Sequence, residues 1–271
     1  MAARIILVGC GNMGYAMLKG WLAAGRLDAG DVVVVEPNAD LRARAGELGT
    51  VTFETADAIP SGFETDLVLF AIKPQVMNDV VPAYSRFAVR GTSFVSIAAG
   101  TTVALLEKLL GANAAILRCM PNTPAAIGKG MMVIFANRNL AEDAKAAIVE
   151  LLSASGRVAE IEDEALMDAV TAVSGSGPAY VFHFIECLRD AGVRAGLPAD
   201  TAGLLAMQTV LGAASLAAES GEEPGRLREQ VTSPNGTTAA ALEVLMGEGR
   251  LGTLLADAVE AARARSVELG R

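Results

Sequence analysis

Short, unbroken apolar runs alternate with longer amphipathic stretches over roughly the first 160 residues of the chain. Unbroken runs of this kind are typical of strands that are covered on both faces of a sheet. We expect strands at residues 5–8, 32–35, 67–71, 93–97, 115–119, 131–135 and 157–161. The stretches between them predict helices over residues 13–24, 39–48, 76–84, 103–110 and 141–152. This alternation of strand and helix predicts an α/β fold with a doubly wound, mostly parallel sheet.

The pattern changes after residue 162. From there to the end, Ala- and Leu-rich helical stretches are separated by turns at residues 174–178, 196–198, 221–225 and 233–236. We therefore expect a first domain over residues 1–162 and an all-helical C-terminal domain over residues 163–271. Residues 201–218 carry no charge, but their apolarity comes largely from alanine, which is marginal for a membrane span. A helix buried on all sides, in a core or between subunits, is the better interpretation. So apolar a helix in a small helical domain suggests that a second chain covers it, and we expect the helical domain to dimerise and no membrane partner.

A glycine-rich motif of the form G-x-G-x-x-G follows the first predicted strand and opens the first predicted helix. Its residues are Gly9, Cys10, Gly11, Asn12, Met13 and Gly14. Glycines at these positions permit a tight turn, the close approach of a pyrophosphate and close helix–sheet packing, and the helix N-terminus attracts the phosphates. The alternative is a plain strand–helix turn. In this context the motif predicts a Rossmann-like, dinucleotide-binding first domain, with the second as the substrate-binding and dimerisation domain.

Residues at the ends of three further strands are expected to line the cofactor, since open α/β sheets bind ligands at the carboxyl ends of their strands. They are Glu36, Ala71, Ile72, Lys73, Pro74, Ala98 and Ala99. The Glu36 carboxylate can accept hydrogen bonds from ribose hydroxyls and would repel a 2′-phosphate, which favours NADH over NADPH. Arg42 and Arg44 follow closely and offer the opposite possibility, a phosphate contact. A solvated Glu36 and an ordinary exposed lysine at Lys73 are the alternatives without a cofactor role.

The amino-acid composition excludes several kinds of partner and site. The chain has 22 Lys and Arg against 31 Asp and Glu, a net charge of −9, one His and three widely separated Cys. We therefore expect no nucleic-acid partner, no metal site and no disulfide framework. No lysine follows Lys145, so the helical domain has no lysine to act as an acid or base. The absence of a recognisable leader before the first strand predicts a cytoplasmic protein with reduced thiols.

Two turns rich in hydroxyl groups and glycine occur in the helical domain. The first, residues 174–180, contains Ser176 and a proline placed to open a helix. The second, residues 233–238, ends at a helix start, where the amides of Gly236 and the residues after it would meet a carboxylate. Helix capping explains either turn alone, but together, beside a dinucleotide fold, they favour a substrate pocket. His183, between two phenylalanines, is expected to be structural.

These residues resemble the pyrroline-5-carboxylate reductase family over essentially the whole chain. The resemblance rests on the glycine motif, on residues 71–74, 118–124 and 174–180 and, most specifically, on residues 224–245. The family often has glycine where this chain has Asn235, a residue that also tolerates left-handed backbone. Glu36 departs further, because many members end this strand with small or basic residues and use NADPH.

The resemblance implies an oxidoreductase of proline biosynthesis, which transfers a hydride from C4 of NADH or NADPH to the C=N carbon of 1-pyrroline-5-carboxylate and forms L-proline. It implies that the Thr238 hydroxyl hydrogen-bonds the imine nitrogen, and that the amides of Gly236 and Thr237, with Ser233, hold the carboxylate. Ser176, in the first turn, is the remaining expected substrate contact. The resemblance also implies a homodimer or higher homo-oligomer in which each site is built from two chains. An iminium is already electrophilic, so this reaction suits a protein with few acid–base residues.

Two other functions stay open. A β-hydroxyacid dehydrogenase-like enzyme has the same two-domain plan, but it needs a lysine after a glycine turn in the helical domain, and residues 177–190 have none. A non-catalytic dinucleotide-binding module would share the glycine motif and the strand ends, and only the two polar turns argue against it. The role of residues 118–124 also stays open, between lining a nicotinamide pocket and forming a turn after a strand.

Overall fold

The computed structural model describes residues 4–88 and 91–270 of the chain. It divides into two compact units: the first contains the chain up to Ser176 and the segment from Ala262 onward, and the second is Gly177–Ala261. The first unit extends beyond residue 162 because the segment that follows is itself buried within it, with Met167 and Ala172 fully covered. The division at residue 162 into a cofactor domain and a substrate domain stays a prediction.

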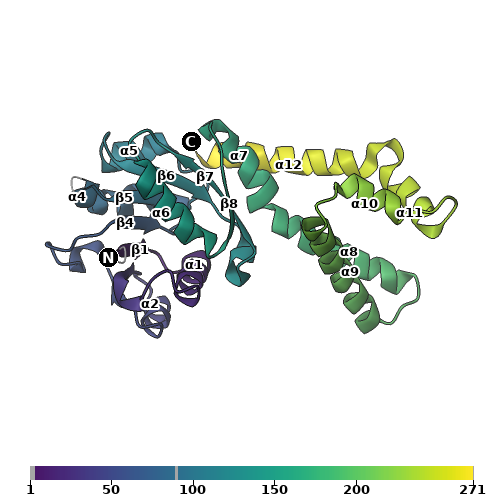
Figure 1. Ribbon diagram of the computed structural model, residues 1–271, viewed down its shortest axis with the longest axis horizontal. Coiled ribbons are helices and arrows are strands. Elements are labelled where there is room, and N and C mark those ends of the chain that lie inside the picture. The colour runs from purple at the N-terminus through teal and green to yellow at the C-terminus, as the bar shows by residue number, and fades with distance from the viewer. Residues whose placement is uncertain (1–3, 89–90, 271) are drawn as a thin grey trace. The chain divides into compact units, whose positions relative to one another are not determined.

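The first unit is built on one eight-stranded sheet (Figure 1). Its strands are β1 Ile5–Val8, β2 Val32–Val35, β3 Val51–Phe53, β4 Leu67–Phe70, β5 Ser93–Ser96, β6 Ala115–Met120, β7 Gly130–Ala136 and β8 Gly156–Glu160. The spatial order is β3-β2-β1-β4-β5-β6-β7-β8, and β6 with β7 is the one antiparallel pair among them. The predicted mostly parallel sheet is confirmed. Its strand order switches direction between β1 and β4, where sheets of this kind bind ligands.

The helices and short helical turns alternate with these strands and then continue alone. The helices are α1 Asn12–Ala23, α2 Ala39–Gly46, α3 Met77–Val80, α4 Ser85–Ala88, α5 Val103–Leu110, α6 Glu142–Ser153, α7 Met167–Val170, α8 Gly177–Arg194, α9 Ala199–Glu219, α10 Pro224–Gln230, α11 Thr237–Met246 and α12 Arg250–Leu269. The short helical turns are η1 Ala29–Asp31, η2 Ala56–Ala58, η3 Pro74–Val76, η4 Val81–Tyr84, η5 Thr123–Ile127, η6 Glu164–Leu166, η7 Thr171–Gly175 and η8 Gly247–Gly249. The second unit is helical throughout, as predicted.

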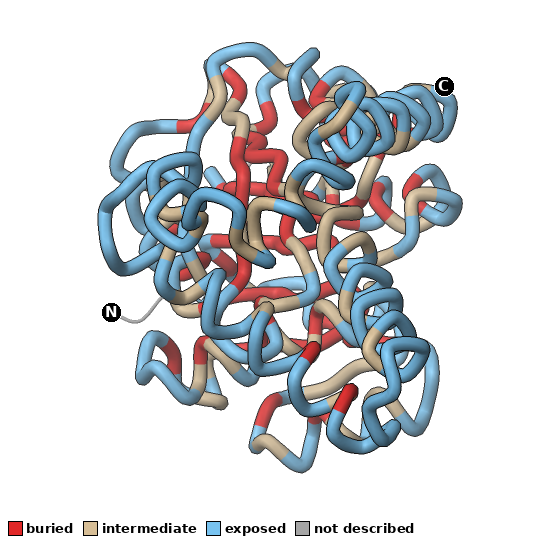
Figure 2. The backbone as a smooth tube through the Cα atoms, turned by 90° about the vertical axis from the view of Figure 1, so that its right-hand side faces the viewer, coloured by how far each residue is buried: buried red, intermediate tan, exposed pale blue. Residues whose placement is uncertain are grey.

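Two apolar cores lie on opposite faces of the sheet, and successive residues of a strand enter them in turn. On β1, Ile5 and Leu7 belong to one core, whereas Ile6 and Val8 belong to the other. Helices α1 and α6 contribute to the first core, and η4 and α5 contribute to the second. Figure 2 shows the long buried stretches of chain that result. Because both faces are covered, the strands need no polar positions, which explains their unbroken apolar runs.

Two details of the first unit differ from the predictions. The apolar pattern does not predict β3, because this three-residue strand at the sheet edge is only partly covered, with Val51 46% exposed. The single helix predicted over residues 76–84 is instead a series of short turns, η3, α3 and η4. Pro82 interrupts it because proline has no N–H to donate to the preceding turn.

The second unit has almost no core of its own. Within Gly177–Ala261, the buried apolar residues are Ala202 and Ala206. Large apolar side chains stay exposed on its helices, such as Leu204 at 69% and Leu254 at 66%. Because an extended apolar surface of this kind is unfavourable in water, the second unit has the character of a subunit interface.

The turn between β1 and α1 depends on two glycines. Gly9 has a φ of +88°, and a Cβ built on it would lie 2.7 Å from the carbonyl oxygen of Ala71. A Cβ on Gly14 would lie 2.4 Å from the carbonyl oxygen of Gly9. A Cβ on Gly11, by contrast, meets no atom within 4 Å. The first and third glycines of the motif therefore allow α1 to pack closely on the sheet, whereas the second leaves open space at the helix start.

We expect Gly14→Ala to lower the free energy of unfolding by about 1–3 kcal/mol, because the added methyl group must push α1 away from the backbone of Gly9. Gly11→Ala is the matched control, since its methyl group meets no atom, and should change that free energy by less than about 0.5 kcal/mol. Urea unfolding followed by circular dichroism measures both values. Equal losses for the two variants would contradict this assignment of the glycines.

Candidate functional site

Two cavities open at the carboxyl ends of the strands in the first unit. The larger has a volume of about 630 Å³ and the smaller about 420 Å³. Four residues line both cavities: Gly11, Ala71, Ile72 and Lys73. The cavities therefore meet at the glycine motif and at the turn that follows β4. Two adjoining cavities of this size suit a long ligand with two bulky ends and a phosphate centre.

Glu36, at the end of β2, lines the larger cavity. Two backbone amides hold its carboxylate: Oε2 accepts from the N–H of Cys10 at 2.7 Å, and Oε1 accepts from that of Asn38 at 2.9 Å. The residue is only 7% exposed. Each carboxylate oxygen has a second lone pair, so it can still accept a hydrogen bond from a ligand hydroxyl. The Glu36 side chain, the expected partner of the ribose hydroxyls, is thus hydrogen-bonded to the glycine motif.

The two arginines that follow β2 are engaged elsewhere. Arg42 donates to the carbonyl oxygen of Glu36 at 2.7 Å, and its guanidinium lies 3.5 Å from the carboxylate of Glu54. Arg44 donates to a carbonyl oxygen of the glycine motif at 3.0 Å and lies over the ring of Tyr15, 3.9 Å from its centroid. The described residues that line the larger cavity include neither arginine. Of the carboxylates that line this cavity, Glu54 is paired with Arg42, whereas the Glu36 carboxylate is held by backbone amides and by neither arginine.

The residues where the cavities meet fit the centre of a dinucleotide. Lys73 is exposed and lines both cavities. Gly11, the N-cap of α1, provides no side-chain cap, so the first amides of the helix stay available to a ligand. An ammonium group and an uncapped helix N-terminus both favour a pyrophosphate.

Tyr84 contributes a polar group to the lining of the larger cavity. It lines this cavity, its side chain is fully buried, and its hydroxyl has no partner among residues 4–88 and 91–270. A buried polar atom without a partner is rare in a folded protein, and a ligand or a water in the cavity can satisfy it. The Tyr84 hydroxyl is therefore a polar group that a ligand in this cavity can hydrogen-bond.

Most of the predicted cofactor residues line one or both cavities. They are Gly9, Gly11, Asn12, Met13, Glu36, Ala71, Ile72, Lys73, Pro74, Ala98 and Ala99. Cys10 and Gly14 line neither. The Cys10 side chain lies in the core, where burial raises the pKa of its thiol to about 11 and keeps it neutral. Gly14 supports the turn from behind, through its close approach to Gly9.

The smaller cavity also contains residues that the sequence left without a role. Its lining includes Met120, Pro121, Asn122, Thr123 and Gly175. The Asn122 side chain accepts from the N–H of Met131 at 2.8 Å and donates to the carbonyl oxygen of Ser174 at 3.1 Å. The signal for this segment is its place after β6, whose carboxyl end meets the same edge of the sheet.

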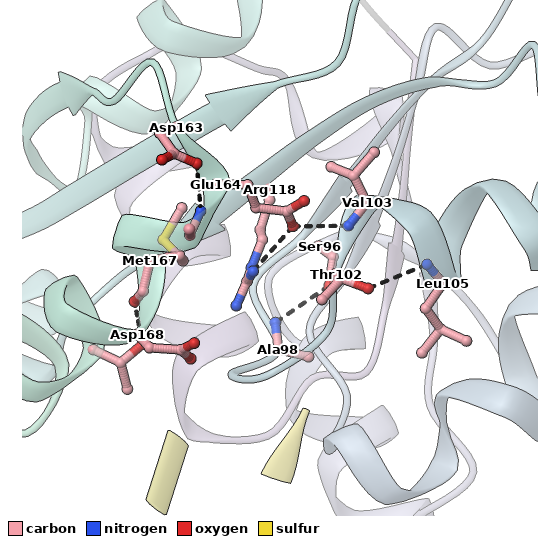
Figure 3. A network of polar contacts seen from close by, with 12 residues as sticks. Ser96, Ala98, Thr102, Val103, Leu105, Arg118, Asp163, Glu164, Met167 and Asp168 are labelled. Carbon is pink, nitrogen blue, oxygen red and sulfur yellow. Dashed lines mark hydrogen bonds and ion pairs between the residues drawn. The ribbon is translucent and has the colours of Figure 1, made fainter. Parts of the chain in front are cut away.

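A partly buried ion pair lies near the turn that contains Ala98 (Figure 3). Arg118 on β6 is 4% exposed and donates from Nη1 to Oε1 of Glu164 at 3.0 Å. The same oxygen accepts the N–H of Val103, at the start of α5, at 2.8 Å. An arginine inside an apolar strand is the sequence signal for a buried partner, but nothing in the sequence pattern identifies Glu164 as that partner.

The predicted carboxylate turn, residues 233–238, lies in the second unit. Asn235 has a φ of +57°, and Gly236 is the N-cap of α11 without a side-chain cap. The sequence suggested that the N–H of Gly236 is open to a ligand. In the structure it is not, because it donates to the carbonyl oxygen of Ser233 at 3.1 Å. The open amides begin at Thr237, since the turn itself uses the one before. Thr238, in the first turn of α11, is half-buried.

The other polar turn, residues 174–180, is mostly helical. Residues Thr171–Gly175 form a π-helical segment, in which the N–H of Ser176 donates to the carbonyl oxygen of Thr171 at 2.8 Å, and α8 starts at Gly177. π-helical segments occur frequently at functional sites. Ser176 belongs to the first compact unit, whereas Ser233, Gly236, Thr237 and Thr238 belong to the second.

His183 is a surface residue of α8 rather than a core one. Its side chain is 76% exposed, with Nδ1 3.1 Å from a carboxylate oxygen of Glu186 and Nε2 3.6 Å from Sγ of Cys187. Within the part of the chain that the structure describes, no group of three or more His, Cys, Asp or Glu side chains is placed to hold a metal ion.

Comparison with known proteins divides the chain in a similar way. Residues 164–269 match the family model described as pyrroline-5-carboxylate reductase dimerisation. Residues 4–100 match the model described as NADP oxidoreductase coenzyme F420-dependent.

Relatives and solved structures match over nearly the whole chain. Pyrroline-5-carboxylate reductase of Pseudomonas aeruginosa is 41% identical, with 98% of this chain and 96% of the relative covered, and that of Synechocystis is 40% identical over the whole of both. The solved pyrroline-5-carboxylate reductase of Coxiella burnetii has a TM-score of 0.93 at 34% identity over all of both chains. The Plasmodium falciparum enzyme, solved with NADP bound, has a TM-score of 0.86 at 28% identity over 99% of this chain and 98% of that one. The chain is therefore a member of the pyrroline-5-carboxylate reductase family.

Proposed function

We infer that the protein reduces 1-pyrroline-5-carboxylate to L-proline with NADH or NADPH, the last step of proline biosynthesis. The observation that carries this conclusion is a pair of cavities that meet at the glycine motif, in a chain that belongs to this family over its whole length. When bound, the reduced nicotinamide supplies the hydride. The protein supplies the binding, orientation and electrostatics.

The two cavities divide the cofactor between them in this proposal. The larger, with Glu36, holds the adenosine half, and the smaller, with Ala98 and Ala99, holds the nicotinamide half. The amides at the start of α1 and the Lys73 ammonium hold the pyrophosphate where the cavities meet. The neutral thiol of Cys10 adds no charge behind the phosphates.

The turn that precedes α11 holds the substrate in this proposal. The open amides that begin at Thr237, with the Ser233 hydroxyl, take the carboxylate at the positive end of the helix. Gly236 gives the turn its shape, because a Cβ there would lie 2.4 Å from Oγ of Ser233. The Thr238 hydroxyl, one residue further along α11, hydrogen-bonds the imine nitrogen. Ser176 is the proposed contact from the first compact unit.

The chemistry demands little from acid–base side chains. A cyclic imine is basic enough to bind protonated, and its carbon then accepts a hydride without a strong acid beside it. This agrees with a chain that has no lysine after Lys145 and whose one histidine, His183, is exposed on a helix. A β-hydroxyacid dehydrogenase-like reaction lacks a lysine base in the helical unit. A non-catalytic dinucleotide-binding module is the second alternative that an assay must separate.

The second unit forms a homo-oligomer, since it matches a dimerisation model and has almost no core of its own. Helix α9 is long and apolar enough to cross a membrane by length and composition alone. We propose instead that a second copy of the chain covers it, because its apolarity comes largely from alanine. The same proposal places the protein in the cytoplasm, with neither a membrane nor a nucleic acid as partner.

The proposed reaction predicts that the purified protein oxidises NADH or NADPH only when 1-pyrroline-5-carboxylate is present. Loss of absorbance at 340 nm, with L-proline identified as the product, measures this. Activity with a β-hydroxyacid in its place would favour the dehydrogenase. Cofactor binding without turnover of either substrate would favour the non-catalytic module.

We expect Thr238→Val to lower kcat/KM by about a hundredfold, because the substitution keeps the shape of the side chain but removes the hydroxyl that meets the imine nitrogen. Thr238→Ser keeps the hydroxyl and should retain most of the activity. Thermal unfolding of both variants checks that the fold is intact. Activity of Thr238→Val equal to that of the unchanged protein would remove Thr238 from the mechanism.

We predict a preference for NADH, because the Glu36 carboxylate lines the larger cavity, while Arg42 and Arg44, which do not line it, are engaged by carbonyl oxygens and, for Arg42, by Glu54. Glu36→Ser should therefore raise kcat/KM for NADPH relative to NADH by about tenfold, since a charge that repels the 2′-phosphate is lost. Glu36→Gln removes the charge but keeps the side-chain length, and should shift the ratio in the same direction.

Initial rates with the two cofactors, measured in parallel, give the ratio for each variant. Glu36→Asp retains the charge and is the control that should keep the preference for NADH. A ratio that stays the same in Glu36→Ser and Glu36→Gln would mean that Glu36 does not select the cofactor.

A further inference from the structure

The turn after β5 forms part of the wall of the smaller cavity and therefore needs a fixed position. Ile97, Ala98 and Ala99 line that cavity. The hydroxyl of Ser96 accepts the N–H of Ala98 at 3.3 Å, which is a long hydrogen bond. Gly100, with a φ of +72°, then leads the chain into α5. The N–H of Thr101 also donates to the carbonyl oxygen of Ala98 at 3.3 Å, so both hydrogen bonds inside the turn are long. Beyond the bond from Ile97 to β4, the position of this wall therefore depends on what packs behind it.

On one side the turn is held by η6. The Glu164 carboxylate accepts the first amide of α5, from Val103, and the buried Arg118 guanidinium holds the same oxygen (Figure 3). A carboxylate at a helix N-terminus is favoured by the helix dipole. The start of α5, and with it the end of the turn, is thereby tied to β6.

On the other side the turn meets the end of α12. A Cβ on Gly100 would lie 3.0 Å from the amide nitrogen of Gly270, and a Cβ on Gly270 would lie 2.8 Å from the carbonyl oxygen of Gly100. The two backbones are therefore in direct contact, with no room for a side chain between them. Ser266, 3% exposed, anchors this end of α12 by donating from Oγ to Oδ1 of Asp168 at 2.6 Å.

Both supports of the turn depend on one short segment of chain, residues 164–170. Glu164 lies in η6 and Asp168 in α7, one helical turn further on, and each makes one of the two attachments. Helix α12 starts in the second compact unit, but its last residues, from Ala262, belong to the first. The position of the β5–α5 turn thus depends on residues more than 160 positions later in the chain.

We propose that the end of α12 and the η6–α7 segment form a bracket that fixes the β5–α5 turn against the nicotinamide half of the cofactor, with Ser266 and Gly270 as positioning residues. The inference rests on the proposed function, which assigns the nicotinamide half to the smaller cavity. The bracket touches neither the larger cavity nor Glu36. It should therefore act on one half of the cofactor and leave the other half alone.

The test compares two ligands that differ only at the nicotinamide end. NADH fills both cavities, whereas ADP-ribose has the adenosine, pyrophosphate and second ribose but no nicotinamide. Gly270→Ala should weaken NADH binding by about tenfold, because the methyl group displaces the turn, and should leave ADP-ribose binding within about twofold. Ser266→Ala, which removes only a hydroxyl, should change the two affinities in the same pattern but by less.

Isothermal titration calorimetry of the intact protein and of each variant, without substrate, measures the affinity for each of the two ligands. Gly62→Ala is the matched control, since a Cβ there meets no atom within 4 Å, and it should bind both ligands as the unchanged protein does. Thermal unfolding of each variant separates a displaced turn from a damaged fold. Equal weakening of both ligands, or no weakening of NADH in either variant, would overturn the bracket. If the unchanged protein bound neither ligand, the proposed cofactor role itself would fail instead.

Discussion

The parallel ladder that joins β1 to β2 and β4 determines where the residues of the cofactor site lie. The ladder continues past the strands, because the N–H of Gly9 donates to the carbonyl oxygen of Val35 and that of Ala71 donates to Val8, both at 2.8 Å. Three strand ends are thus locked together at one edge of the sheet. The glycine motif can follow this edge only because Gly9 and Gly14 carry no side chain. Both cavities are consequences of this arrangement.

One buried and one partly buried carboxylate show how the structure compensates polar groups that are shielded from water. Glu36 is compensated by two backbone amides, and Glu164 by a buried arginine and one amide. A buried carboxylate without such partners would be strongly destabilising. Since the partners belong to the glycine motif, to the start of α2, to β6 and to the start of α5, the same bonds that satisfy the carboxylates also join the elements that line the cavities.

The accuracy of the sequence-based predictions follows how local each signal is. The apolar runs locate seven of the eight strands. Every residue of β1, β2, β4 and β5 is buried, which keeps their runs apolar, whereas β8 at the sheet edge is largely exposed. The edge strand β3 is not predicted, because it is partly exposed and has no long apolar run. The helix expected over residues 76–84 is broken by Pro82, and the turn expected at residues 174–178 is the end of a π-helical segment and the start of α8. At β3, at residues 76–84 and at residues 174–178 the sequence pattern extends over only a few residues. The backbone conformation there depends on packing rather than on the pattern.

The sequence by itself determined the doubly wound sheet, the dinucleotide motif with Glu36 after β2, the helical second unit and the family. Each depends on residues close together in the chain or on a pattern repeated along it. Only the tertiary structure decided that Arg42 and Arg44 bond backbone carbonyls near Glu36 and the glycine motif, that Glu164 pairs with Arg118, and that Gly270 meets Gly100. These contacts join residues whose side-chain directions and distances depend on the packing of whole elements, which no local pattern encodes.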